Sequence, residues 1–115
     1  MHELGIASEI VSVVTDALNN QSIGRPVKKI RLTIGEMRQI VPDSLQFCFD
    51  SLTRDTLLEN ARLEIRHIPL SGTCSSCGRE IEFTEPPFRC PDCSGTEMQM
   101  QHGFELDVTS FEVED

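Results

Sequence analysis

The chain has 115 residues, of which 38% are hydrophobic, and a formal net charge of −9 at pH 7. This size allows one compact core, so any second unit must be small and stabilised by something other than apolar burial. The negative charge opposes binding to nucleic acids and to anionic membranes, because both are polyanions. The start, Met-His-Glu, lacks the basic segment and apolar run of a secretory signal, which predicts a cytoplasmic protein.

The first predicted element is an amphipathic helix over residues 6–18. Its apolar residues recur at spacings of three and four and form one stripe, namely Ile6, Ile10, Val13, Val14 and Leu18. A polar segment with Gly24 and Pro26 ends this helix. Residues 29–34 then alternate between polar and apolar, which predicts a strand with one buried face, closed by Gly35.

A second helix is predicted to begin at Pro42 and Asp43, through the preset φ angle of proline and a capping carboxylate. The apolar residues that follow at helical spacing are Leu45, Cys48, Phe49 and Leu52. This pattern makes the solitary Cys48 a core residue. Residues 62–66 alternate again, which predicts a second strand that ends near Pro69.

Periodic patterns disappear between Leu70 and Gly103, where glycines, prolines and four of the five cysteines concentrate. From Phe104 to Val108 the alternation returns. Phe111 and Val113 lie out of phase with it, which indicates a bulge after Val108.

The order of elements predicts an α+β fold in which two helices pack on a small mixed three-stranded sheet. A four-cysteine zinc module of the zinc-ribbon or rubredoxin-like type is inserted into it. The predicted domains are 1–69, completed by a C-terminal strand at 104–115, and the inserted module at 70–103.

The cysteine spacing predicts a metal site. Twelve residues separate the pair Cys74 and Cys77 from the pair Cys90 and Cys93, so that two tight turns can each contribute two thiolates to a tetrahedron. Gly78 and Gly95 suit the left-handed backbone of such turns. Zinc fits best. A rubredoxin-like iron site is the main alternative, and a redox Cys-x-x-Cys is disfavoured because neither pair opens a helix within a βαβ pattern.

His2 beside a free N-terminus is a second candidate metal site. The terminal amine, the amide nitrogen of His2 and its imidazole can close two fused chelate rings, to which Glu3 can add its amide or its carboxylate. Such a nitrogen-rich set suits Ni(II) or Cu(II) better than Zn(II). The alternative is a solvated histidine and a glutamate that favours the helix N-terminus.

Four segments together resemble the HypA/HybF family of nickel metallochaperones for [NiFe]-hydrogenase maturation. They are Met1-His2-Glu3-Leu4, Ile34-Gly35-Glu36, Val41-Pro42-Asp43-Ser44-Leu45 and the two cysteine pairs, which occur in the family's order over the whole chain. The resemblance implies a nickel site at Met1, His2 and Glu3 and a structural zinc at Cys74, Cys77, Cys90 and Cys93. It also implies a partner GTPase of the HypB type and delivery of nickel to the hydrogenase large-subunit precursor. The sequence leaves open whether the chain is a monomer or a homodimer.

Other functions stay open at the level of sequence. A zinc-ribbon module that binds proteins without handling nickel is the main alternative. Nucleic-acid binding has local support from Arg25, Lys28, Lys29, Arg31 and Arg38, although a solvated sheet face explains them better. His67 and His102 flank the metal module and are predicted to be hydrogen-bonded rather than metal ligands. No nucleophile is paired with a base, so no enzymatic activity is expected.

Overall fold

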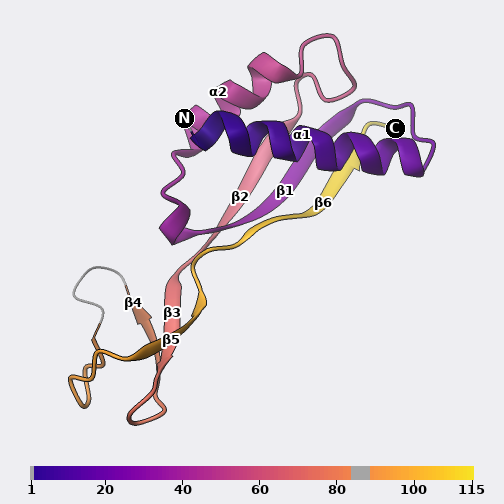
Figure 1. Cartoon of the computed structure of the whole chain (residues 1–115). Coiled ribbons are helices and arrows are strands. Elements are labelled where there is room, and N and C mark those ends of the chain that lie inside the picture. The colour runs from indigo at the N-terminus through magenta and orange to yellow at the C-terminus, as the bar shows by residue number, and fades with distance from the viewer. Residues whose placement is uncertain (1, 84–88) are drawn as a thin grey trace. The chain divides into compact units, whose positions relative to one another are not determined.

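The computed structural model describes residues 2–83 and 89–115, and at His2 it describes the backbone alone. Its elements, labelled in Figure 1, are α1 (His2–Asn20), β1 (Val27–Gly35), the 3-10 helix η1 (Glu36–Arg38), α2 (Pro42–Leu52), β2 (Arg62–Ile68), β3 (Leu70–Cys74), β4 (Glu80–Phe83), β5 (Met98–His102) and β6 (Leu106–Val113). The strands form two three-stranded sheets, in the orders β2-β1-β6 and β4-β3-β5. The predicted α+β fold with two helices, a small sheet and a separate cysteine-containing module is confirmed.

The chain divides into two compact units. Unit 1 comprises Met1–Thr33, Ile40–Arg66 and Asp107–Asp115, and unit 2 comprises Ile34–Gln39 and His67–Leu106. The predicted limits of the metal module, 70–103, stay a prediction.

Unit 1 has its core between the two helices, which pack against each other, and the sheet. The largest buried apolar side chains of the helices are Ile6, Ile10, Val14, Leu18, Leu45 and Phe49, and those of β1 are Val27, Ile30 and Leu32. The predicted stripe was wrong at Val13, which is 47% exposed, because residues 6, 10, 14 and 18 follow a spacing of four and leave Val13 at the edge. Leu52, the last residue of α2, is also exposed.

Helix α2 begins as predicted at Pro42, but its start is capped differently. The N-cap residue is Val41, which makes no side-chain capping hydrogen bond. Asp43 does not cap the helix but lies in its first turn, near the positive end of the helix dipole. Neither helix of the described chain is long and apolar enough to cross a membrane.

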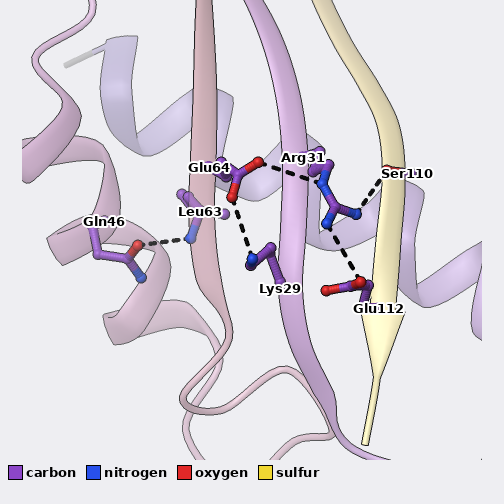
Figure 2. Close-up of polar contacts among 7 residues, drawn as sticks. All are labelled: Lys29, Arg31, Gln46, Leu63, Glu64, Ser110 and Glu112. Atoms are coloured by element: carbon purple, nitrogen blue, oxygen red, sulfur yellow. Dashed lines mark hydrogen bonds and ion pairs between the residues drawn. The ribbon is translucent and has the colours of Figure 1, made fainter.

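A network of ion pairs crosses the sheet of unit 1 (Figure 2). Arg31 on β1 contacts Glu64 on β2 at 3.4 Å and Glu112 on β6 at 3.4 Å, and Lys29 contacts Glu64 at 3.3 Å. The Arg31 hydrogen bond and charge lower the pKa of Glu112. Because Lys29 and Arg31 already pair with the carboxylates of Glu64 and Glu112, this part of the sheet is a solvated, charge-balanced face, which argues against binding to nucleic acid.

Unit 2 contains three strands that the sequence analysis missed. Strand β3 pairs antiparallel with β4 on one side and with β5 on the other. In β5, Met98 and Met100 alternate with glutamines, a signal that could have indicated the strand. The pattern is weak because most of β5 is exposed, so this strand needs little apolar alternation.

The chain returns to the first sheet later than predicted. Strand β6 begins at Leu106, and Phe104 lies before it with an exposed side chain, so the predicted start at Phe104 was wrong. Within β6 two successive exposed residues, Thr109 and Ser110, separate Val108 from Phe111. The burial pattern therefore changes phase after Val108, where the sequence predicts a bulge.

Candidate metal centres

The first cysteine turn follows β3. Cys74 is its last residue, and the N–H of Gly78 donates to the carbonyl of Cys74 at 2.8 Å, which closes the turn around Cys77. Gly78 has φ of +77°, so the predicted left-handed backbone is confirmed here. The N–H of Cys74 donates to the carbonyl of Arg79, which leads the chain into β4.

The second cysteine turn repeats this arrangement. The N–H of Ser94 donates to the carbonyl of Cys90 at 2.8 Å, and the N–H of Cys90 donates to the carbonyl of Gly95 at 3.0 Å. Here the left-handed residue is Ser94, with φ of 60°, so the prediction for Gly95 was wrong. At Gly95 space is limited instead, because a Cβ atom there would lie 3.3 Å from Cys93 Sγ and 3.4 Å from Ser76 Oγ.

The two turns bring their four sulfurs together. Sγ of Cys74 lies 3.6 Å from that of Cys93, and Sγ of Cys77 lies 3.5 Å from that of Cys90. All four lie within 4.8 Å of one another, and none of the cysteines forms a disulfide. A zinc ion with Zn–S bonds of ~2.3 Å needs sulfurs ~3.8 Å apart, so the donor set fits tetrahedral zinc.

The surroundings of the sulfurs shift the thiol pKa values of the cysteines in different directions. The N–H groups of Cys77 and Ser76 lower the pKa of Cys74 to about 7. At Cys77 the N–H of Arg79 acts in the same direction, but the neighbouring sulfurs and desolvation outweigh it and raise the pKa to about 12. The pKa of Cys93 is also raised, because sulfurs nearby and desolvation outweigh the N–H of Gly95. Four sulfurs this close share their protons until a cation neutralises them.

These pKa shifts predict that zinc uptake releases protons. Zinc binds thiolates, so Cys77 and Cys93, whose thiol pKa values are raised by the neighbouring sulfurs and by desolvation, must lose their protons on binding. We therefore expect release of at least two protons per zinc, and an apparent affinity that rises with pH by at least about a hundredfold per unit near neutrality.

Calorimetry of zinc binding in buffers of different ionisation enthalpy measures this proton count. Cys48→Ser is the matched control, because Cys48 is a buried cysteine of unit 1 outside the cluster and its removal should leave the count unchanged. A release of clearly fewer than two protons per zinc would contradict the expectation.

The second predicted site lies at the start of α1, where Met1 and the imidazole of His2 fall outside the described part of the chain. The Glu3 side chain is described and is only 8% exposed. The N–H of Val41, the N-cap residue of α2, donates to Glu3 Oε2 at 3.4 Å. The carboxylate thus joins the starts of both helices.

The two histidines that flank the cysteines lie apart from the cluster of four sulfurs. His102, at the end of β5, shares a hydrogen bond with Glu105 through Nδ1 at 2.8 Å. Glu105 also accepts from the N–H of Gly103. These bonds outweigh desolvation and lower the pKa of the Glu105 carboxyl. His102 therefore has the hydrogen-bonded role that its position at a strand end predicts.

Sequence reasoning missed two polar contacts at these sites. One is the bond from Val41 to Glu3, whose partners lie 38 residues apart, and the other is an ion pair between Arg79 and Asp92 at 2.5 Å. Both contacts join segments that are separated in sequence, and no local sequence pattern predicts such a pairing.

The sequence matches a known protein family and several of its members. Residues 1–113 match a family described as "Hydrogenase/urease nickel incorporation, metallochaperone, hypA". A hydrogenase maturation factor HypA from Trichodesmium erythraeum is 42% identical over all 115 residues and 97% of its own length. Its counterpart from Desulfosudis oleivorans is 37% identical over the full length of both chains.

The fold also matches solved structures. The solution structure of the Ni metallochaperone HypA from Helicobacter pylori aligns with a TM-score of 0.66 over 96% of both chains, at 16% identity. A second solution structure of a HypA protein aligns with a TM-score of 0.70 over 98% of this chain and 96% of that one, at 17% identity.

The chain has an α+β fold with a four-cysteine cluster in its second unit. Residues 1–113 match a nickel-incorporation family, so the protein is of the metallochaperone class. Within this class the chain belongs to the HypA family.

Proposed function

We propose that this protein binds Ni(II) at its N-terminus and delivers it to the [NiFe]-hydrogenase large-subunit precursor, together with a GTPase of the HypB type. Membership of the HypA family over residues 1–113 carries this proposal. The starting sequence Met-His-Glu supports it, because an amine, amide nitrogens and an imidazole form the nitrogen-rich set that Ni(II) prefers.

The ligands of the proposed nickel site are Met1, His2 and Glu3. Met1 would contribute its amine, His2 its amide and imidazole nitrogens, and Glu3 its amide nitrogen. The buried carboxylate of Glu3 already accepts a hydrogen bond from Val41, which favours the amide as the ligand at this residue. A site at a chain terminus can release its metal, because a terminus opens more readily than a segment that is held at both ends.

We further propose that Cys74, Cys77, Cys90 and Cys93 hold one structural zinc. Four thiolates fill all positions of a tetrahedral ion and leave none for water or substrate. This site would stabilise unit 2 rather than catalyse a reaction. The protein would therefore act as a carrier of nickel and not as an enzyme.

Complementation tests this function. The host is a strain that produces a [NiFe]-hydrogenase and lacks its own member of the family. We expect the wild-type chain to restore hydrogenase activity, and His2→Ala to restore less than about a tenth of it, because one lost ligand weakens nickel binding by more than the loss of an outer-shell partner.

His67→Ala is the matched control, since it removes a histidine of unit 2 outside the proposed nickel site and should restore activity fully. Zinc content and expression are compared across the three proteins. Full restoration by His2→Ala would favour the alternative, a zinc-ribbon interaction module that handles no nickel.

A further inference from the structure

Arg79 and Asp92 connect the two cysteine turns outside the cluster of sulfurs. Arg79 lies two residues after Cys77, and Asp92 lies between Cys90 and Cys93. Arg79 Nη1 contacts Asp92 Oδ1 at 2.5 Å, with both side chains about half exposed. Each turn is closed by its own backbone hydrogen bonds, whereas this ion pair joins one turn to the other.

The ion pair joins residues that neighbour the two exposed cysteines in sequence. Cys77 and Cys93 are exposed, whereas Cys74 and Cys90 are buried. A closed site of four cysteines has no free coordination position, so a competing ligand must displace a thiolate, and the exposed ones are reached first. Arg79 and Asp92 each lie within two residues of an exposed cysteine.

We infer that Arg79 is a positioning residue for zinc, which acts with Asp92 as a latch that holds the two cysteine turns together and slows zinc loss. Displacement of a thiolate requires its turn to move outward, and the latch opposes that movement. An exposed ion pair has a modest energy, so the effect falls on the rate of opening and not on whether the unit folds. The inference rests on the proposed occupancy of the cysteines by zinc.

The test measures zinc transfer from the full-length zinc-loaded protein to an excess of the chelating dye 4-(2-pyridylazo)resorcinol. We expect Arg79→Ala and Asp92→Asn each to release zinc about two- to fivefold faster than wild type. The double variant should be no faster than Arg79→Ala, because both changes open the same contact. Arg79→Lys, which keeps a cation, should recover most of the wild-type rate.

Two comparisons separate a latch from a general effect of charge. Arg89→Ala makes the same change in net charge next to Cys90, at a residue with no ion pair seen within 2–83 and 89–115, and should leave the rate unchanged. Asp92→Asn leaves the Arg79 cation free to stabilise the thiolates. A purely electrostatic role would therefore make Asp92→Asn slower than wild type, and the latch makes it faster.

Equal rates for Arg79→Ala and wild type, an equal acceleration by Arg89→Ala, or multiplied effects in the double variant would overturn the latch and leave the zinc site intact. A wild-type protein purified without zinc would overturn the zinc assignment and the latch with it. The two failures are thus distinguishable by metal analysis of the starting protein.

Discussion

Removal of zinc is expected to unfold unit 2 and leave unit 1 folded. Among the described residues, the buried apolar side chains of unit 2 are Ile34, Leu70 and Phe83, besides Cys74 and Cys90 of the proposed zinc site. So small a core cannot offset the conformational entropy of its chain. A structural zinc of this kind contributes about 10–16 kcal/mol of binding free energy, which here is the free energy that folds the unit. Unit 1 retains its core between α1, α2 and β1 without the metal.

Amide NMR spectra of the protein before and after treatment with a strong chelator measure this effect. We expect signals from β3, β4 and β5 to collapse to unfolded positions while those of α1 and α2 persist. Cys77→Ser should reproduce the loss without chelator.

Cys48→Ser is the matched control, because it removes a cysteine from the core of unit 1 and leaves the four ligands in place. It should lower the stability of unit 1 and retain one zinc per chain. Dispersed signals for unit 2 in the metal-free protein would show that apolar packing suffices and that the zinc is not structural.

Loss of nickel binding from changes at the N-terminus is the second large expected effect. His2→Ala removes the imidazole and the chelate ring that it closes. We expect nickel affinity to fall by at least about a hundredfold, at the upper end of what losing an outer-shell partner costs a metal site. An extension of a few residues ahead of Met1 converts the terminal amine to an amide and should have an equal effect. Isothermal titration of the zinc-loaded protein with Ni(II) measures both.

The other two histidines provide the controls for this titration. His67→Ala and His102→Ala lie in unit 2, and we expect wild-type nickel affinity from each. Glu3→Gln keeps the amide of residue 3 and a side-chain acceptor for Val41, so it should retain nickel if the amide is the ligand. Unchanged nickel binding in the extended chain would exclude the terminal amine and contradict the proposed site.

The helices, the strands of the first sheet and the cysteine cluster could be predicted because each has a local signature. The apolar stripe of α1, the alternation in β1 and the Cys-x2-Cys spacing all reflect the geometry of short segments. The buried position of Cys48 also followed from helical spacing alone. The strands of unit 2 could not be predicted in the same way, because sulfur ligation can replace the apolar face that reveals a strand.

Polar contacts between distant residues required the folded structure. The sequence predicts Glu3 as a metal ligand or as an acidic residue that favours a helix N-terminus, but the packing of α1 on α2 buries its carboxylate against the N–H of Val41. Arg79 and Asp92 read as isolated surface charges until two turns converge and place them at 2.5 Å. Short-range patterns determine the helices, the strands of the first sheet and the cysteine turns, whereas the partner of a side chain lies 13 or 38 residues away in these two contacts, and only packing brings such segments together.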